Sequence, residues 1–271
     1  MISFPNAKIN LGLNILSKRL DGFHNISSCF YPIGWSDILE IIPSNKLKFS
    51  SSGIIIPGNP SENLCIKAYN RLKEDYQIPP VHIHLHKIIP IGAGLGGGSA
   101  DGAFTLKMLN QMYNLNLATA VLEEYATILG SDCSFFIENE PVIVSGVGSE
   151  FNATSIDISG MKISVIYPNK HISTQEAYSN VVPHTPQHSI NNILNQPISN
   201  WKSLLVNDFE ISSSENYREI IRIKEVLYEH GALYTSMSGS GSAVFGLFDK
   251  NFDLSIIVNY TENHQSWSGI L

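Results

Sequence analysis

The sequence predicts an α+β protein with two domains, in which strands and helices occupy separate stretches of the chain. Length is the first reason, because 271 residues exceed the usual size of one domain. Strand-like patterns dominate residues 4–55, whereas helical periodicity follows a glycine-rich stretch further on. A second mixed region opens near residue 161, with a helix expected over 215–230. We therefore expect domains of residues 1–152 and 153–271.

Composition and charge argue against several classes of protein. The net charge of −7, from 17 basic and 24 acidic residues, offers no basic surface for nucleic acid. The chain has an odd number of cysteines, and they are widely spaced: Cys29, Cys65 and Cys133. This pattern favours neither a disulfide framework nor a zinc site. The chain begins without a signal-peptide pattern and has no apolar run of about 18 residues. We expect a cytoplasmic protein that binds neither nucleic acid nor a membrane.

The first segment with a chemical pattern is NAKINLGL. Ile9 and Leu11 point to one face of a predicted strand, and Lys8 and Asn10 point to the other. An ammonium and an amide beside Gly12 would form a small polar platform on a rigid strand. The alternative, which this strand alone favours, is a solvated outer face with ordinary surface side chains.

The turn DGFHN places an aromatic ring next to an imidazole. Phe23 can stack on a planar ligand, and His24 can form a hydrogen bond with the ligand's edge. The alternative is a hairpin turn with one buried ring.

Apolar residues alternate with histidines in VHIHLHK, which is the period of a strand with one buried face. The histidines at 82, 84 and 86 would share the other face. A metal site is one interpretation of them, but no fourth ligand can be nominated. A solvated strand face is therefore favoured.

The stretch PIGAGLGGGSADG, residues 90–102, follows this strand and precedes a helix predicted from apolar residues between Ala103 and Tyr113. Ser99 occupies the position where an N-cap is expected. Free backbone N–H groups at a helix start, together with the helix dipole, favour an anion. The stretch therefore predicts a phosphate site, and the alternative is a tight structural turn.

The loop lacks the context of two common phosphate-binding motifs. Gly92, Gly94 and Gly97 spell GxGxxG, but a helical pattern follows where the dinucleotide fingerprint needs a second strand. The Walker motif needs Lys directly after its last glycine, whereas Ser99 follows Gly98. Such a loop must neutralise phosphate with amide groups and the helix end.

Two later segments contain polar residues that are candidates for a functional site. Asp132 in LGSDCSFF is either a cap or first-turn acid of a new helical turn, which this segment alone favours, or a general base or orienting carboxylate for a hydroxyl nucleophile. Residues 238–242 in SMSGSGSAVFGLF form a second loop of serine and glycine, which is either a tight turn or a second clamp on a ligand.

These motifs resemble those of the GHMP small-molecule kinases. The matching segments are PNAKINLGLNILSKRLDGFHNI, NLCIKAYNRL, KIIPIGAGLGGGSADGA, LGSDCSFF, LLVNDFE and GALYTSMSGSGSAVFGLF. The resemblance implies an N-terminal lobe like ribosomal protein S5 and a C-terminal ferredoxin-like lobe. It also implies ATP and Mg²⁺ as cofactors and a cytidine-diphosphate conjugate as the acceptor. The stretch after Phe248 is short for the last helix and strand of the second lobe.

The resemblance also implies roles for individual residues. Lys8 and Asp132 match the catalytic pair. The implied ATP-binding residues are Asn63, Lys87, Pro90, Ile91, Gly92, Ala93, Gly94, Leu95, Gly96, Gly97, Gly98, Ser99 and Ala100. The implied acceptor-binding residues are Asn10, Phe23, His24 and Thr174, with Phe23 in place of the tyrosine usual in the family. No metal-ligating residue is nominated.

Three other functions are compatible with the sequence. A nucleotide-binding protein without catalysis would keep the loop but need neither Lys8 nor Asp132. A dehydrogenase would use the literal GxGxxG. A homoserine or mevalonate type of kinase would share the glycine loop, so the choice of acceptor must come from Phe23 and His24.

Overall fold

The computed structural model describes residues 1–179, 181–211, 215–258 and 264–271. Contacts divide the chain into two compact units, each made of several segments. Unit 1 comprises Met1–Ala7, Ser36–Ile91 and Gly96–Glu140, and unit 2 comprises Lys8–Trp35, Gly92–Leu95 and Pro141–Leu271. This division does not follow a single cut near residue 152, because the strand pair that carries Lys8 groups with the C-terminal part of the chain.

Unit 1 contains a four-stranded sheet with the strand order β1-β4-β6-β5. Its strands are β1 (Ile2–Ser3), β4 (Ile38–Pro43), β5 (Lys48–Gly53) and β6 (Val81–Lys87). Strand β6 runs antiparallel to β4 and parallel to β5. Its apolar side chains are buried, as the alternation predicts. On the opposite face, Ser50 and Ser52 of β5 lie 2.8 to 3.0 Å from ring nitrogens of His82, His84 and His86.

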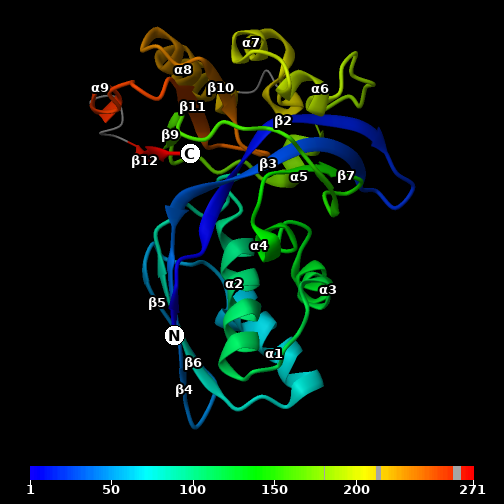
Figure 1. Cartoon of the computed structure of the whole chain (residues 1–271), viewed down its shortest axis with the longest axis vertical. Coiled ribbons are helices and arrows are strands. Elements are labelled where there is room, and N and C mark those ends of the chain that lie inside the picture. Colours follow the sequence, from blue (N-terminus) through cyan, green and yellow to red (C-terminus); the bar gives the residue numbers. More distant parts are fainter. Residues whose placement is uncertain (180, 212–214, 259–263) are drawn as a thin grey trace. The chain divides into compact units, whose positions relative to one another are not determined.

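Helices accompany this sheet in unit 1. They are η1 (Pro60–Glu62), α1 (Leu64–Tyr76), α2 (Gly97–Met112), α3 (Thr119–Leu129) and α4 (Phe135–Glu138). Figure 1 shows α1, α2 and α3 on one side of β4, β5 and β6, and α2 packs against both α1 and α3. Helix α2 starts after Gly96, whose φ of 71° is a left-handed conformation that glycine tolerates. The expectation of Ser99 as the N-cap is therefore wrong, and Ser99 lies in the first turn.

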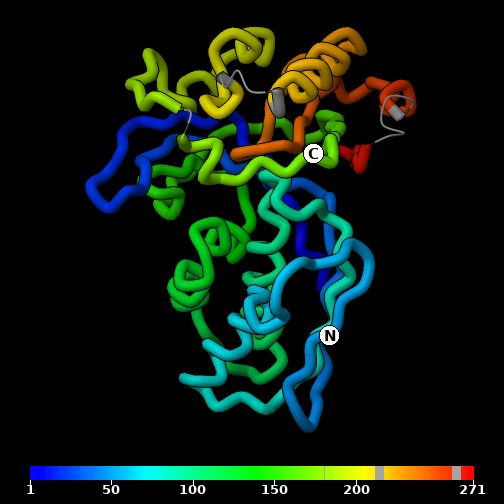
Figure 2. Tube along the Cα trace, turned by 180° about the vertical axis from the view of Figure 1, so that it is seen from behind, coloured from blue at the N-terminus to red at the C-terminus, as the bar shows by residue number. Residues whose placement is uncertain are grey.

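One sheet of unit 2 is built on a long hairpin. Its strands are β2 (Asn6–Lys18), β3 (His24–Ser36), β7 (Val142–Ser145) and β8 (Glu150–Ala153), in the order β2-β3-β7-β8. In Figure 2 the blue trace of residues 8–35 lies beside the yellow and orange trace of the C-terminal part of the chain. Leu13 and Ile26 of the hairpin share a hydrophobic core with Ile166, Leu227 and Phe248. This shared core explains why the hairpin belongs to unit 2.

The second sheet of unit 2 is antiparallel throughout, with the order β10-β11-β9-β12. Its strands are β9 (Lys162–Tyr167), β10 (Tyr234–Met237), β11 (Val244–Phe248) and β12 (Gln265–Ile270). Helix α8 (Glu215–Glu229) precedes β10, and α9 (Ser255–Val258) precedes β12. This β-α-β-β-α-β sequence is the ferredoxin-like arrangement. The last helix and strand are both present.

Short helices complete unit 2. They are α5 (Thr174–Ser179), α6 (Ile190–Leu194), η2 (Ile198–Asn200), α7 (Trp201–Leu204) and η3 (Asp208–Ile211). Both units mix strands and helices, so the fold class is α+β, as predicted. Within the described ranges, no helix combines the length and the apolar character needed to cross a membrane.

Candidate active site

The glycine loop contributes to both units. Residues 92–95 belong to unit 2, and residues 96–100 belong to unit 1, where they start α2. Gly94 has a φ of 79°, and a Cβ atom at this position would lie only 1.9 Å from the Ser238 carbonyl oxygen. Any other residue would therefore displace the backbone of the serine-glycine loop. The glycine at 94 is required for contact between two loops of unit 2.

The start of α2 has the properties of an anion site. The Ala100 N–H donates to the Gly96 carbonyl at 2.9 Å, which leaves the N–H groups of Gly97, Gly98 and Ser99 without an acceptor inside the helix. A Cβ atom at Gly98 would meet nothing within 4 Å, so the helix start is open there. The 16-residue helix adds its dipole. This end of α2 suits a phosphate group.

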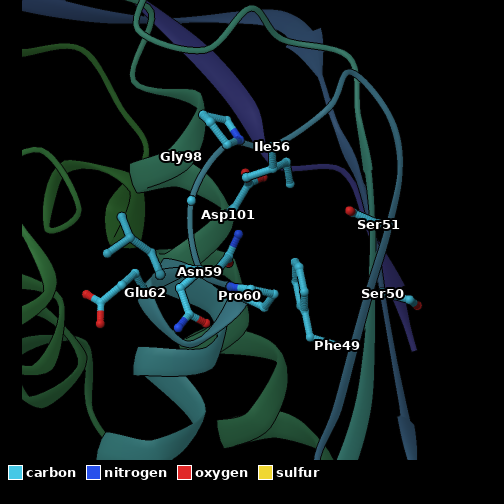
Figure 3. Close-up of a pocket in the computed structure, with 13 residues that line it drawn as sticks. Phe49, Ser50, Ser51, Ile56, Asn59, Pro60, Glu62, Gly98 and Asp101 are labelled. Carbon is cyan, nitrogen blue, oxygen red and sulfur yellow. The ribbon is translucent and has the colours of Figure 1, made fainter.

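A pocket of about 330 Å³ lies beside the start of α2. Its lining residues are Phe49, Ser50, Ser51, Ile56, Pro57, Gly58, Asn59, Pro60, Glu62, Asn63, Leu64, Gly98 and Asp101. Figure 3 shows Phe49 and Ser51, from β5, across the pocket from Gly98 and Asp101, from α2. Asn63 caps α1, because its Oδ1 accepts from the Cys65 N–H at 2.9 Å. The volume lies within the range of small-molecule sites.

Lys87 is buried in a cluster of charges. Its Nζ donates to Asp37 Oδ2 and to Asp101 Oδ2, each at 2.6 Å. Asp37 Oδ1 also accepts from the N–H groups of Ile88 and Ile89, at 2.5 and 2.9 Å. Burial alone would lower the pKa of Lys87, but the two carboxylates raise it above its usual value. The ammonium is therefore charged and donates to both carboxylates, and Lys87 is not one of the residues that line this pocket.

Sequence reasoning missed Asp37 and the role of Asp101. The one available signal was that Asp101 is the only charged residue in the glycine-rich stretch 90–102. Its partners stand 14 and 64 positions away in the chain, so no local pattern could identify them.

Lys8 forms the polar platform that one interpretation of its strand predicted. Lys8 and Asn10 are only 3% and 1% exposed, so the alternative of a solvated outer face is wrong. Lys8 Nζ donates to Asn10 Oδ1 at 2.6 Å and to the Gly94 carbonyl at 3.1 Å. Asn10 Nδ2 donates to Ser28 Oγ at 2.8 Å, and this hydroxyl donates to the Gly12 carbonyl at 2.6 Å. This network fixes the ammonium against the glycine loop.

The serine-glycine loop supports the glycine loop from within unit 2. Ser238 Oγ donates to the Gly94 carbonyl at 2.8 Å. Asn207, in the NDFE segment, donates through Nδ2 to the carbonyls of Met237 and Gly239 at 2.8 and 2.9 Å. Sequence reasoning used NDFE only for the family resemblance and missed that Asn207 holds this loop.

Asp132 lies in unit 1, in the turn before α4. It is partly exposed, and Ser131 Oγ lies 3.5 Å from its Oδ1. Ser134, rather than Asp132, directly precedes the first residue of α4, so the interpretation of Asp132 as the cap of this helix is wrong. The interpretation as a general base stays a prediction.

An aromatic group surrounds His24 in unit 2. Its ring stacks on Tyr178, with centroids 4.8 Å apart and planes inclined by 19°, and Tyr178 meets the edge of Phe209. Burial, with a smaller effect of Lys18, lowers the pKa of His24, so the imidazole is neutral near pH 7. Phe23 is 65% exposed, so it is not the buried ring that the alternative interpretation of this hairpin turn requires. Sequence reasoning missed Tyr178, although it is the last residue of the ISTQEAY segment that contains Thr174.

Thr174 starts α5 in the same unit. Its Oγ1 lies 3.5 Å from the Ser240 hydroxyl, which belongs to the serine-glycine loop. Asn10 contacts the same serine-glycine loop, because Ser238 Oγ donates to its Oδ1 at 3.4 Å. The structure thus brings Asn10 and Thr174 to one loop.

Comparison with known proteins identifies relatives over nearly the whole chain. Residues 63–139 match the GHMP kinases N terminal domain, and residues 190–261 match the GHMP kinases C terminal domain. A 4-diphosphocytidyl-2-C-methyl-D-erythritol kinase of Cytophaga hutchinsonii is 56% identical over 250 residues, which cover 92% of this chain and 93% of the relative. A kinase of the same description from Bacteroides fragilis is 52% identical, with 92% of each chain covered.

Solved structures of similar proteins share the fold of this chain over nearly its whole length. The crystal structure of a 4-(cytidine 5'-diphospho)-2C-methyl-D-erythritol kinase has a TM-score of 0.86 and 28% identity, and covers 99% of this chain and 98% of its own. The mevalonate kinase of Methanococcus jannaschii has a TM-score of 0.73 at 14% identity, with 100% and 98% covered. At that identity the likeness concerns the fold alone.

Proposed function

Because this chain belongs to the GHMP kinase family, we propose that the features described above carry out one phosphoryl transfer from ATP. The enzyme phosphorylates 4-diphosphocytidyl-2-C-methyl-D-erythritol, a step of isoprenoid biosynthesis. The relative that is 56% identical over 92% of this chain carries this conclusion. Our proposal adds that the phosphoryl group goes to the 2-hydroxyl group of the acceptor.

The start of α2 is the site that we propose for the ATP phosphates. The N–H groups of residues 97–99 and the open space at Gly98 fit a polyanion. Mg²⁺ would reach the site with the triphosphate, whose oxygens supply its main ligands, and would neutralise part of the charge. The pocket beside Gly98 then receives the adenine base, with Asn63 among its lining residues.

Asp132 and Lys8 are the residues that we propose for the chemical step. Asp132 takes the proton from the acceptor hydroxyl as its oxygen bonds to the γ-phosphorus. The bond from that phosphorus to the β–γ bridging oxygen breaks, and ADP leaves. The Lys8 ammonium balances the negative charge that develops during the transfer. The bonds from Lys8 to Asn10 and Gly94 support this role, because they hold the charge in one position.

The acceptor side is proposed to lie around His24 in unit 2. A neutral imidazole offers one ring nitrogen as an acceptor and one N–H as a donor, which suits the polar edge of cytosine. Phe23 adds a flat, exposed face, although it lacks the hydroxyl of a tyrosine. Asn10 and Thr174, which both lie at the serine-glycine loop, complete the proposed set.

Substitution of Gly98 separates nucleotide binding from folding. We expect Gly98→Ala to keep or raise the melting temperature, because alanine is favoured over glycine inside a helix by about 1 kcal/mol and meets no atom here. The same methyl group would stand where the phosphate approaches, so the dissociation constant for ATP should rise, and Gly98→Val should raise it further. Calorimetric titration with ATP and thermal unfolding measure both effects. Unchanged ATP affinity in a folded Gly98→Val protein would remove the helix start from the nucleotide site.

Substitution of His24 tests the acceptor assignment. We expect His24→Ala to weaken acceptor binding by about 1 to 3 kcal/mol, the range for losing a partner of a buried polar group. ATP affinity should change little. The assay compares the cytidine-diphosphate conjugate with free methylerythritol, homoserine, mevalonate and galactose, each with ATP and Mg²⁺, on both proteins. A preference for any acceptor without cytidine, or equal losses for ATP and conjugate, would contradict the assignment.

A further inference from the structure

The His171 ring lies directly against the glycine loop, within unit 2. Gly92 has a φ of 68°, and a Cβ atom at this position would lie 2.6 Å from His171 Nδ1 and 2.7 Å from Cε1. The imidazole therefore fills the space that a side chain at position 92 would need. His171 is exposed, and neither ring nitrogen has a hydrogen-bond or ion-pair partner in the described part of the chain. The edge with Nδ1 thus packs on the loop, which leaves the edge with Nε2 for a ligand.

The backbone on both sides of His171 is held in place. The Lys170 carbonyl accepts a hydrogen bond from Ser242 Oγ, in the serine-glycine loop. On the other side, Ile172 is buried in the hydrophobic core of unit 2. The residue after Ser242 donates its N–H to the Ala93 carbonyl at 3.1 Å, so the serine-glycine loop also holds the glycine loop beside the ring. The imidazole is therefore presented at a fixed place on the glycine loop.

The surroundings of the ring suit a phosphate group. Lys8, in the same unit, donates to the Gly94 carbonyl, two residues beyond Gly92 in the chain. Two residues span at most about 7 Å, so the ammonium and the imidazole both lie beside one short stretch of loop. The N–H groups of Gly92 and Gly94 have no acceptor among the described residues, and they add two donors. A group with several charged acceptor oxygens fits this set of donors.

We propose that His171 is a further nucleotide-binding residue, whose imidazole donates a hydrogen bond from Nε2–H to the γ-phosphate of ATP. The proposal rests on the proposed function, in which Lys8 balances the charge at the transferred phosphorus, so that this phosphate lies at the same part of the loop. A neutral imidazole carries its proton on either nitrogen, and an acceptor at Nε2 selects the tautomer with the proton there. Gly92 sets the position of the ring because it has no side chain.

Two substitutions of His171 separate the hydrogen bond from the packing. His171→Phe keeps a flat ring against Gly92 but has no donor, and should raise the dissociation constant for ATP about tenfold or more, because a hydrogen bond to a charged group is lost. His171→Gln keeps an N–H donor at a similar reach, and this constant should stay within about threefold of the wild-type value. A Phe variant that binds ATP as tightly as the wild type, or a Gln variant as defective as the Phe variant, would overturn the proposal.

The number of phosphates gives a measurement that a merely structural role would not change. ATP and ADP, each with Mg²⁺, are titrated calorimetrically into the complete protein. We expect His171→Phe to weaken the binding of ATP and to leave that of ADP nearly unchanged, because ADP lacks the γ-phosphate. Equal losses for ATP and ADP would mean that the ring only shapes the loop, which would overturn the proposal. His188→Phe, which changes another exposed imidazole of unit 2, is the matched control and should alter neither constant.

A double-mutant cycle tests the contact between the ring and the loop. Gly92→Ala places a methyl group where the ring lies, so it should displace the imidazole and weaken the binding of ATP. In the background of His171→Ala the same change displaces no ring and should cost less, since the strain of a left-handed alanine is common to both proteins. Additive losses would contradict a donor that Gly92 positions. If thermal unfolding shows that Gly92→Ala does not fold, the comparison of ATP with ADP in His171→Phe still decides the question.

These results are separable from a failure of the proposed function. Calorimetry with nucleotide alone requires no acceptor, so it tests His171 even if the protein does not phosphorylate the cytidine-diphosphate conjugate. Conversely, normal turnover of that conjugate by His171→Phe, with an unchanged KM for ATP, would leave the function in place and remove the role of His171.

Discussion

Replacing Asp132 by asparagine is expected to lower kcat by about 10²–10⁴-fold, the usual contribution of a general base. Asparagine keeps the size of the side chain and one acceptor oxygen, but it cannot take the proton of the acceptor hydroxyl. The KM for ATP should change little, because the phosphates are proposed to bind at the start of α2. Steady-state kinetics with the cytidine-diphosphate conjugate measures both quantities.

Glu138→Gln is the control for this experiment, since it removes an exposed carboxylate from α4, directly after the same turn. It should leave kcat near the wild-type value. Near-normal turnover in Asp132→Asn would show that the carboxylate is not the base, and would return Asp132 to a structural role in the turn.

Replacing Lys8 by methionine is the second change with a large expected effect. Methionine keeps most of the apolar stem but removes the charge, and loss of one preorganised electrostatic group lowers kcat by about 10²–10³-fold. The KM for ATP should rise by a smaller factor, because the charge is used mainly in the transition state. The measurement is again kcat and KM, together with thermal unfolding.

Folding must be checked for this variant because Lys8 also donates to Asn10 and Gly94. Lys46→Met, at an exposed position between β4 and β5, is the control that removes a charge without touching this network. An increase in KM with unchanged kcat would make Lys8 a group that binds nucleotide without acting on the chemical step.

The regular elements of this fold were predictable because their signals are local. Alternation in VHIHLHK predicts β6, and the apolar periodicity after the glycine loop predicts α2. The expected N-cap at Ser99 was wrong because an N-cap serine must itself have an extended backbone, whereas Ser99 is already helical. Gly96 instead takes a left-handed conformation and starts the helix earlier.

The site was less predictable because its contacts are distant in sequence. Whether the polar face of β2 is solvated depends on Gly94 and Ser238, which the pattern of the strand itself cannot reveal. The cluster around Lys87 likewise joins residues from three separate segments. The family resemblance supplied Lys8 and Asp132 as candidates, but it did not supply Asp37, Asn207 or Tyr178.

The interleaving of the two units along the chain has a consequence for biosynthesis. Unit 1 is complete once residue 140 has left the ribosome, whereas unit 2 requires residues up to 271. The hairpin of β2 and β3 is therefore among the first segments of the nascent chain to emerge, yet the strands that cover its apolar side chains are translated last. An apolar surface of this kind stays exposed throughout elongation and is prone to association with other chains. We expect production of this protein in cells to benefit from slower translation and from chaperones that bind early nascent segments.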